Sequence, residues 1–405
     1  MNDFLPISCH VMAKPSGSIC NLDCTYCFYL EKEHLYPNRK LNWKMNLATV
    51  EAFIKQQIDA QHGAEVVIAW QGGEPTLLGL DFFKAAMLFV DKHAREKTVS
   101  HTMQTNGILL DNAWCSFFKK NDFLIGISID GPEEMHDKYR LTRSGKPTHA
   151  RVLEAILLLQ EHQVEFNTLT VVSDFNVKSP LKLYHYLKSI GSNNIQFIPL
   201  VERISNQADE NGLYLISPQS NLASTVTSWS VKPQEFGKFL AEIFTEWIKH
   251  DIGTVYIQTF EQAFAAWAKM PAIICVFAPR CGSNFALEAN GDLYACDHYV
   301  YPEYKLGNIH ETSIKAMNES SSNLAFGKSK SSSLTKKCQQ CEFKFACYGG
   351  CPKHRFTINE NGEPGHNYLC GAYEMFFKSS NKNLKLMSNL WERGHSPMLI
   401  KEILK

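Results

Sequence analysis

The sequence predicts an α/β protein in which a partial (βα)6 TIM-like barrel is followed by a cysteine-rich domain. Two observations support this prediction. Six apolar runs of the β type alternate with helical segments through the first 200 residues, as in a parallel sheet with crossover helices. Beyond residue 273 this alternation fades, and closely spaced cysteines take its place. Six units, where a complete barrel has eight, indicate a barrel that does not close.

The predicted strands are nearly continuous apolar runs, which suit burial on both faces of a sheet. They span residues 7–13, 65–70, 100–106, 123–130, 165–172 and 194–200. Helical periodicity lies between them, at residues 46–61, 80–94, 148–163 and 179–191. In such folds the active site lies beyond the carboxyl ends of the strands, so the loop after the first strand belongs to that rim.

The chain divides into four predicted parts. These are a barrel at 1–231, a helical linker at 232–274, the cysteine-rich domain at 275–375 and a C-terminal helical tail at 376–405. A polar stretch at 205–231 predicts a surface excursion, and an amphipathic helix is expected over 232–250. The serine-rich stretch at 329–334 is expected to be a flexible loop. Metal ligation is expected to stabilise the last domain more than apolar burial does.

Composition excludes several kinds of partner. Lys plus Arg and Asp plus Glu total 41 each, so no global charge favours nucleic acid or an anionic membrane. The amino terminus lacks the features of a signal peptide, and no apolar run approaches the ~20 residues that cross a bilayer. We expect a cytoplasmic monomer that acts on a peptide or a small molecule. In that reducing compartment, clustered cysteines favour metal sites over disulfides.

Eleven of the 13 cysteines form spaced groups. The first group, Cys20, Cys24 and Cys27, gives three thiolates for the four irons of a [4Fe–4S] cube, which leaves one iron open to a small chelating molecule. Eight further cysteines suffice for two fully ligated cubes: Cys275, Cys281, Cys296, Cys338, Cys341, Cys347, Cys351 and Cys370. Cys9 and Cys115 are left over and are expected to be buried apolar thiols.

Zinc is the alternative for the first group, and a non-enzymatic zinc-binding interaction protein is the more distant hypothesis. Zinc ribbons pair two Cys-x2-Cys knuckles close together in sequence. No fourth ligand of that kind lies near residues 20–27. The spacing alone does not exclude zinc, but this context favours iron and sulfur.

The first cysteine group, with Tyr26 and Phe28 on either side of Cys27, resembles the signature of the radical S-adenosylmethionine (SAM) superfamily. Two other segments are similar to that family: the Trp-Gln-Gly-Gly-Glu-Pro run that begins at Trp70, and Ile-Ser-Ile-Asp-Gly at 127–131. The resemblance implies SAM at the open iron. It also implies the cofactor-binding residues Gln71, Gly72, Gly73, Glu74, Ser128, Arg151 and Leu200. Glycines permit close approach of the backbone to a ligand. A strand-to-helix turn is the alternative for the Gly-Gly segment, and a solvated helix position is the alternative for Arg151.

The later cysteines resemble the seven-cysteine pattern of the SPASM domain, with Cys281-x9-Gly291-x4-Cys296 as its first part. Cys275 supplies an eighth thiol. The resemblance implies a first auxiliary cluster on Cys275, Cys281, Cys296 and Cys351. It implies a second auxiliary cluster on Cys338, Cys341, Cys347 and Cys370, and therefore three [4Fe–4S] clusters in the chain.

Asp297 directly follows Cys296, and in this position it resembles the base of anaerobic sulfatase-maturating enzymes. A surface aspartate in a turn is the alternative. The resemblance implies that a 5′-deoxyadenosyl radical abstracts hydrogen from a Ser or Cys of an unfolded sulfatase polypeptide. Asp297 then removes a proton and an auxiliary cluster accepts the electron. Cα-formylglycine results directly from Ser, or by hydrolysis of a thioaldehyde from Cys. A low-potential donor, flavodoxin or ferredoxin, would supply the first electron.

A thioether-forming maturase of the same superfamily is the nearer alternative function. Many such enzymes carry an amino-terminal recognition domain, and only 19 residues precede Cys20, too few for a domain. The sequence leaves open whether Ser or Cys is preferred, and which sulfatase is the partner.

Overall fold

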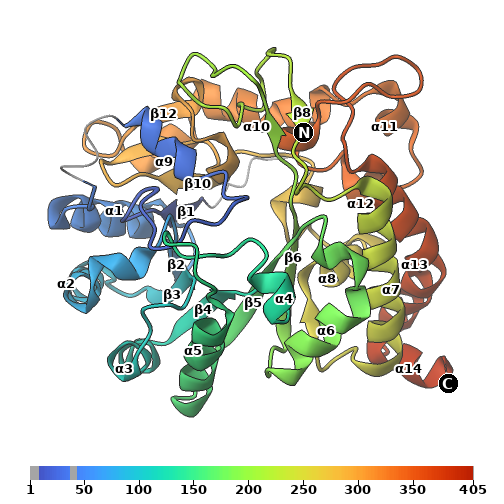
Figure 1. The fold of residues 1–405 in the computed structure, drawn as a ribbon, viewed down its shortest axis with the longest axis horizontal. Coiled ribbons are helices and arrows are strands. Elements are labelled where there is room, and N and C mark those ends of the chain that lie inside the picture. Colours follow the sequence, from blue (N-terminus) through green and yellow to red (C-terminus); the bar gives the residue numbers. More distant parts are fainter. Residues whose placement is uncertain (1–8, 37–42, 405) are drawn as a thin grey trace.

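The structure, a computed structural model, describes residues 9–36 and 43–404, and one ten-stranded sheet runs through it (Figure 1). The six predicted strands are β1 (His10–Ala13), β2 (Glu65–Trp70), β3 (Thr98–Thr105), β4 (Phe123–Ser128), β5 (Phe166–Val172) and β6 (Asn194–Pro199). They lie side by side in chain order and are all parallel. The predicted α/β partial barrel is confirmed, although residues 7 and 8 of the first predicted strand lie outside the described residues.

Amphipathic helices cover the outer side of this sheet (Figure 1). They are α1 (Leu47–Ala60), α2 (Leu80–His93), α3 (Asn112–Lys120), α5 (His149–Glu161) and α6 (Pro180–Ser189). α3 follows the third strand, where the six predicted β–α units require a helix, although the sequence analysis gave no bounds for it. The carboxylate of Asp111 caps α3 by accepting the N–H of Trp114 at 2.9 Å. Cys115 on this helix and Cys9 are both buried, as predicted.

The sheet continues beyond the six predicted strands at both edges. β9 (Tyr256–Ile257) pairs in parallel with β6, and β10 (Asn284–Leu287) pairs in parallel with β1. β11 (Asp292–Tyr294) and β12 (Lys305–Asn308) follow as antiparallel strands. The predicted linker and cysteine-rich domain therefore both add strands to the barrel sheet. This pairing satisfies backbone groups that would otherwise stay open along β1 and β6.

A layer of three helices packs beside the end of the sheet that carries β6 and β9 (Figure 1). It consists of α7 (Pro233–His250), α8 (Gln258–Trp267) and α13 (Cys370–Glu392). The ring of Phe244 on α7 lies 5.2 Å from that of Phe260 and 5.7 Å from that of Phe376, centroid to centroid. Because α13 is continuous from Cys370 onward, the boundary predicted at residue 375 falls inside a helix.

The flexible loop predicted at residues 329–334 is wrong for most of its length. Residues up to 332 belong to α10 (Ser321–Ser332), which Ser320 caps by accepting the N–H of Asn323 at 3.3 Å. The buried ammonium of Lys330 donates to the carbonyls of Cys275 at 2.6 Å and Val276 at 2.8 Å. Serine is a weak helix former, so these tertiary bonds, which local sequence does not reveal, hold the helix in place.

The predicted excursion at 205–231 is attached to the rest of the fold. It begins directly after β7 (Arg203–Ile204) and contains β8 (Thr225–Val226), and these two strands form a short antiparallel pair. The carboxylate of Glu31 accepts the N–H groups of Tyr214 at 3.0 Å and Leu215 at 2.9 Å. Within the described part of the chain, no helix has both the length and the apolar character that a membrane span requires.

Candidate active site

The first cysteine group lies on the loop that follows β1, at the carboxyl end of the parallel strands. The backbone of this loop is bonded to the segment after β4: Asp23 N–H donates to Leu141 O at 2.9 Å, and Thr25 N–H donates to Tyr139 O at 3.1 Å. A β-bridge between Leu22 and Thr142 lies next to the first of these bonds. The loop is thus fixed on the segment that follows β4.

The three thiols of this loop are partly buried and influence one another electrostatically. Burial raises the pKa of Cys20 and of Cys24 to about 12, and that of Cys27 to about 11. The charge of Cys27 adds to this increase at both other thiols. Such thiols become thiolates only beside a strong positive charge, which an iron–sulfur cluster would supply.

Gly72 and Gly73 let the turn after β2 approach the cysteine loop. Gly73 N–H donates to Gly17 O at 2.6 Å, and Glu74 N–H donates to Ile19 O at 2.9 Å. A Cβ on Gly73 would overlap the carbonyl of Ile19, and Gly72 adopts a φ of +126°. The sequence analysis attributed both glycines to the approach of a ligand. In the structure they permit contact between two parts of the chain that meet at the first cysteine group.

Glu74 joins this turn to the end of β3. Its buried carboxylate accepts the N–H and hydroxyl of Thr76, the hydroxyl of Thr105 at 2.8 Å and the N–H of Asn106 at 2.8 Å. The amide of Asn106 in turn donates to Cys20 Sγ at 3.6 Å. Donors from the protein fill the hydrogen-bonding positions of the Glu74 carboxylate. Its role is therefore to position the residues of the site. Gln71 is fixed through its own N–H, which donates to Ala13 O at 2.9 Å.

The remaining SAM-side candidates lie in different surroundings. Leu200 is buried after β6 and lines a cavity of about 240 Å³ together with Cys27 and Cys351. Ser128 is the last residue of β4. Arg151 is exposed on α5, where its guanidinium donates to Ile108 O at 3.0 Å. The structure therefore brings Leu200, but not Arg151, to the cavity beside the first cysteine group.

The first auxiliary group of four cysteines reaches the same cavity through Cys351. Burial raises the pKa of Cys281 to about 12 and that of Cys296 well above its usual range, and the charges of Cys351 and Cys275 raise both further. Cys351 Sγ lies 3.7 Å from His298 Nδ1, and Cys275 is exposed. Four thiols distant in sequence thus become neighbours.

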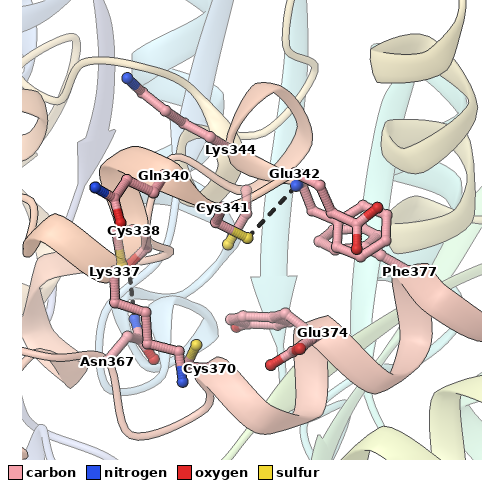
Figure 2. A pocket seen from close by; sticks show the side chains of 14 residues that line it. Lys337, Cys338, Gln340, Cys341, Glu342, Lys344, Asn367, Cys370, Glu374 and Phe377 are labelled. Carbon is pink, nitrogen blue, oxygen red and sulfur yellow. Dashed lines mark hydrogen bonds between the residues drawn. The ribbon is translucent and has the colours of Figure 1, made fainter. Parts of the chain in front are cut away.

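The second auxiliary group of four, Cys338, Cys341, Cys347 and Cys370, lines one cavity of about 340 Å³. Figure 2 shows the labelled Cys338, Cys341 and Cys370 around a common space. That volume equals about ten water molecules, and the thiol donors suit a ligated cluster. In the part of the chain that the structure describes, no three His, Cys, Asp or Glu side chains converge closely enough for a single metal ion.

Asp297 is held by a lysine from the barrel. Its carboxylate accepts a charged hydrogen bond from Nζ of Lys14, a buried residue that directly follows β1. Nζ of Lys14 also lies 3.5 Å from the centroid of the Tyr29 ring. Burial alone would raise the pKa of Asp297, but the charge of Lys14 is the leading opposing influence and the net pKa is lowered. Asp297 is therefore ionised at neutral pH.

Glu288 is a second buried carboxyl beside this pair. It follows β10, and the hydroxyl of Tyr29 donates to it. Burial raises the pKa of Glu288 to about 8, with Lys14 opposing and Asp297 adding to the increase. The sequence analysis named neither Lys14 nor Glu288. Lys14 could have been noticed as a charged residue at the carboxyl end of a predicted strand, whereas nothing local marks Glu288.

A thiol triplet at the rim of a parallel partial barrel, together with two further groups of four thiols, defines a radical SAM enzyme with an auxiliary iron–sulfur domain. Residues 15–187 match the Radical SAM superfamily, and residues 275–342 match SPASM, an iron-sulfur cluster-binding domain. The chain belongs to the anaerobic sulfatase-maturating enzymes, as the resemblance implied.

The relatives that show this family cover nearly the whole chain. A serine-type anaerobic sulfatase-maturating enzyme of Bacteroides thetaiotaomicron is 42% identical over 98% of this chain and 95% of its own length. A cysteine-type enzyme of Clostridium novyi is 31% identical over 93% of this chain and 96% of its own. The solved structure of native anSMEcpe with bound AdoMet and the Cp18Cys peptide superposes with a TM-score of 0.81 at 30% identity, covering 94% of this chain and 98% of that one.

Proposed function

We propose that this enzyme oxidises a serine of an unfolded sulfatase polypeptide to Cα-formylglycine, using SAM and three [4Fe–4S] clusters, with Asp297 as the base. One observation carries the proposal. Lys14 keeps Asp297 ionised. The sequence neighbours of Asp297 are Cys296, of the first auxiliary group, and His298, which lines the same cavity as Cys27. The preference for serine rests on the 42% identity to a serine-type relative, against 31% to a cysteine-type one.

Two sets of residues would hold the first cluster and SAM. Cys20, Cys24 and Cys27 would ligate the first cluster. SAM would lie against the turn that begins at Gln71, near Ser128 and Leu200, and Arg151 is proposed as a further contact. When bound, these groups supply a 5′-deoxyadenosyl radical that takes a hydrogen atom from the β-carbon, and the auxiliary clusters supply an electron acceptor. A low-potential donor such as flavodoxin or ferredoxin would reduce the first cluster.

The residues of the chain account for removal of the substrate proton and for entry of the sulfatase segment into the cavity. Asp297 accepts the hydroxyl proton of serine, or the thiol proton of cysteine, as the carbon–oxygen or carbon–sulfur double bond forms. Lys14 keeps the carboxylate ionised and oriented until then. The cavity, of about 240 Å³, has room for a side chain and its flanking backbone and not for a folded domain. The sulfatase segment must therefore enter extended.

Two peptides that contain the sulfatase motif, identical except for Ser or Cys at the target, test this proposal. Under anaerobic conditions with SAM and a reductant, the serine peptide should lose two hydrogens and become an aldehyde. Reconstituted enzyme should hold about 12 irons. Conversion of the cysteine peptide alone would refute the serine preference. Zinc, or about four irons, would refute the assignment of three clusters.

A further inference from the structure

A buried arginine lies beside the first cysteine group. Arg140 belongs to the segment whose backbone bonds to that loop through Leu141 and Tyr139, and its side chain is only 9% exposed. Its Nη1 donates to the hydroxyl of Tyr26 at 2.7 Å, and that hydroxyl donates to Asp130 Oδ2 at 2.5 Å. Tyr26 and Asp130 thus fix the guanidinium from the cysteine loop and from the end of β4.

The positive charge of Arg140 is incompletely compensated. Its nearest carboxylate oxygen, Asp130 Oδ1, lies 3.8 Å from Nη1. Its Nε is buried and has no hydrogen-bond partner among the described residues. An arginine keeps its proton in proteins, so this charge is permanent. A buried donor without a protein partner leaves one position for a hydrogen bond to a bound group.

The guanidinium is held against the loop that carries all three thiols. Its partner Tyr26 stands between Cys24 and Cys27 in the sequence. The residues on either side of Arg140 bond to the same loop, with Thr25 N–H donating to Tyr139 O and Asp23 N–H donating to Leu141 O. The fixed charge of Arg140 therefore lies beside the first cysteine group.

We propose that Arg140 sets the reduction potential of the cluster held by Cys20, Cys24 and Cys27, by placing a fixed positive charge next to it. The low-potential donor adds one electron to this cluster. A neighbouring cation stabilises the added negative charge, most strongly where water is excluded. Arg140 is thus a positioning residue that raises the potential, and Asp130 partly opposes it. The inference rests on the proposed function only for the cluster assignment.

Potentiometric titration followed by EPR spectroscopy of the full enzyme tests this inference. The part of the signal that changes on addition of SAM reports the first cluster. At a fixed ambient potential, Arg140→Gln should lower the ratio of reduced to oxidised cluster about tenfold, a shift of about 59 mV for one electron. Arg140→Lys keeps the charge and should stay close to the parent. Asp130→Asn should raise the ratio.

Arg143→Gln is the matched control. Arg143 lies on the same segment and its Nε donates to Cys20 O at 2.9 Å, but its side chain is in solvent, where water and salt screen the charge. This variant should shift the ratio little. Iron content and circular dichroism establish that each variant is folded and loaded.

Two results would overturn the inference. One is an Arg140→Gln enzyme that has its full iron content and an unchanged ratio of reduced to oxidised cluster. The other is an equal decrease of that ratio in Arg140→Gln and Arg140→Lys. If Arg140→Gln loses the cluster, Asp130→Asn decides the question, since an unchanged or lower ratio contradicts the proposed charge effect. A triple Cys20, Cys24, Cys27 to Ala variant that kept the SAM-sensitive signal would instead refute the cluster assignment.

Discussion

Lys14 and Asp297 form an ion pair that joins the end of the first barrel strand to the residue after Cys296. The parallel pairing of β1 with β10 brings them together, with Ala13 opposite Leu287 and the Lys14 N–H donating to Leu287 O at 2.8 Å. The barrel and the cysteine-rich region therefore build one site, because the sheet that carries the first cysteine loop also orients the proposed base.

Lys14→Met should separate hydrogen abstraction from aldehyde formation. Without the ammonium, Asp297 is neither oriented nor held ionised as firmly, so aldehyde formation should fall by on the order of tenfold or more while 5′-deoxyadenosine still forms. Lys14→Arg should recover part of the loss. Measuring both products in one reaction checks this, with the exposed Lys44→Met as control. An equal ratio of aldehyde to 5′-deoxyadenosine in Lys14→Met and in the parent would contradict a role for Lys14.

Gly73→Ala should disturb the first cysteine loop selectively. The new methyl group would overlap the Ile19 carbonyl, and overpacking of this kind costs about 1–3 kcal/mol. Iron content should fall toward two thirds of the parent value, with loss of SAM cleavage. Gly63→Ala is the control, since its Cβ would come no closer than 3.9 Å to any neighbour. Full iron and full SAM cleavage in Gly73→Ala would show that the close approach is dispensable.

Glu288 should make stability depend on pH. Its pKa is about 8 in the folded chain against 4.5 ordinarily, so between these values folding takes up a proton. The contribution of Glu288 to the free energy of unfolding is fully present below pH 4.5. It declines as the pH rises toward 8, by at most about 1.4 kcal/mol per pH unit. Anaerobic urea midpoints at several pH values should decline less steeply for Glu288→Gln. Parallel declines in the two proteins would contradict the raised pKa.

Cys351→Ala should damage the first auxiliary group alone. Cys351 acts on Cys281 and Cys296, although its neighbours in sequence line the other thiol cavity. Iron analysis should show the loss of about one third of the metal, together with poorer solubility. Cys115→Ala removes a buried thiol outside the three groups and should keep all the iron. A soluble Cys351→Ala enzyme with complete iron would refute this ligand assignment.

The local sequence pattern predicted most helices and strands of the barrel. Pairing between strands distant in sequence brings the site residues together, and the local pattern does not reveal that pairing. The apolar run at 65–70 coincides with β2, and the amphipathic run at 232–250 gives α7 to within one residue. β10 has four residues and pairs with a strand some 270 positions earlier, so no local period reveals it. The Lys14 contact with Asp297 follows from that pairing. The Tyr26 contact with Arg140 depends on a β-bridge that is equally invisible in the sequence.

Asp297→Asn, assayed on the serine peptide, tests the central claim most directly. The amide keeps the shape of the side chain but accepts no proton, so aldehyde formation should fall by on the order of 10²-fold while 5′-deoxyadenosine continues to form. The cysteine peptide should be affected less, since a thiol of pKa ~8.5 releases its proton far more readily than a hydroxyl. The exposed Glu303→Gln serves as control. Aldehyde formation at the parental rate on both peptides would contradict the assignment of Asp297 as the base.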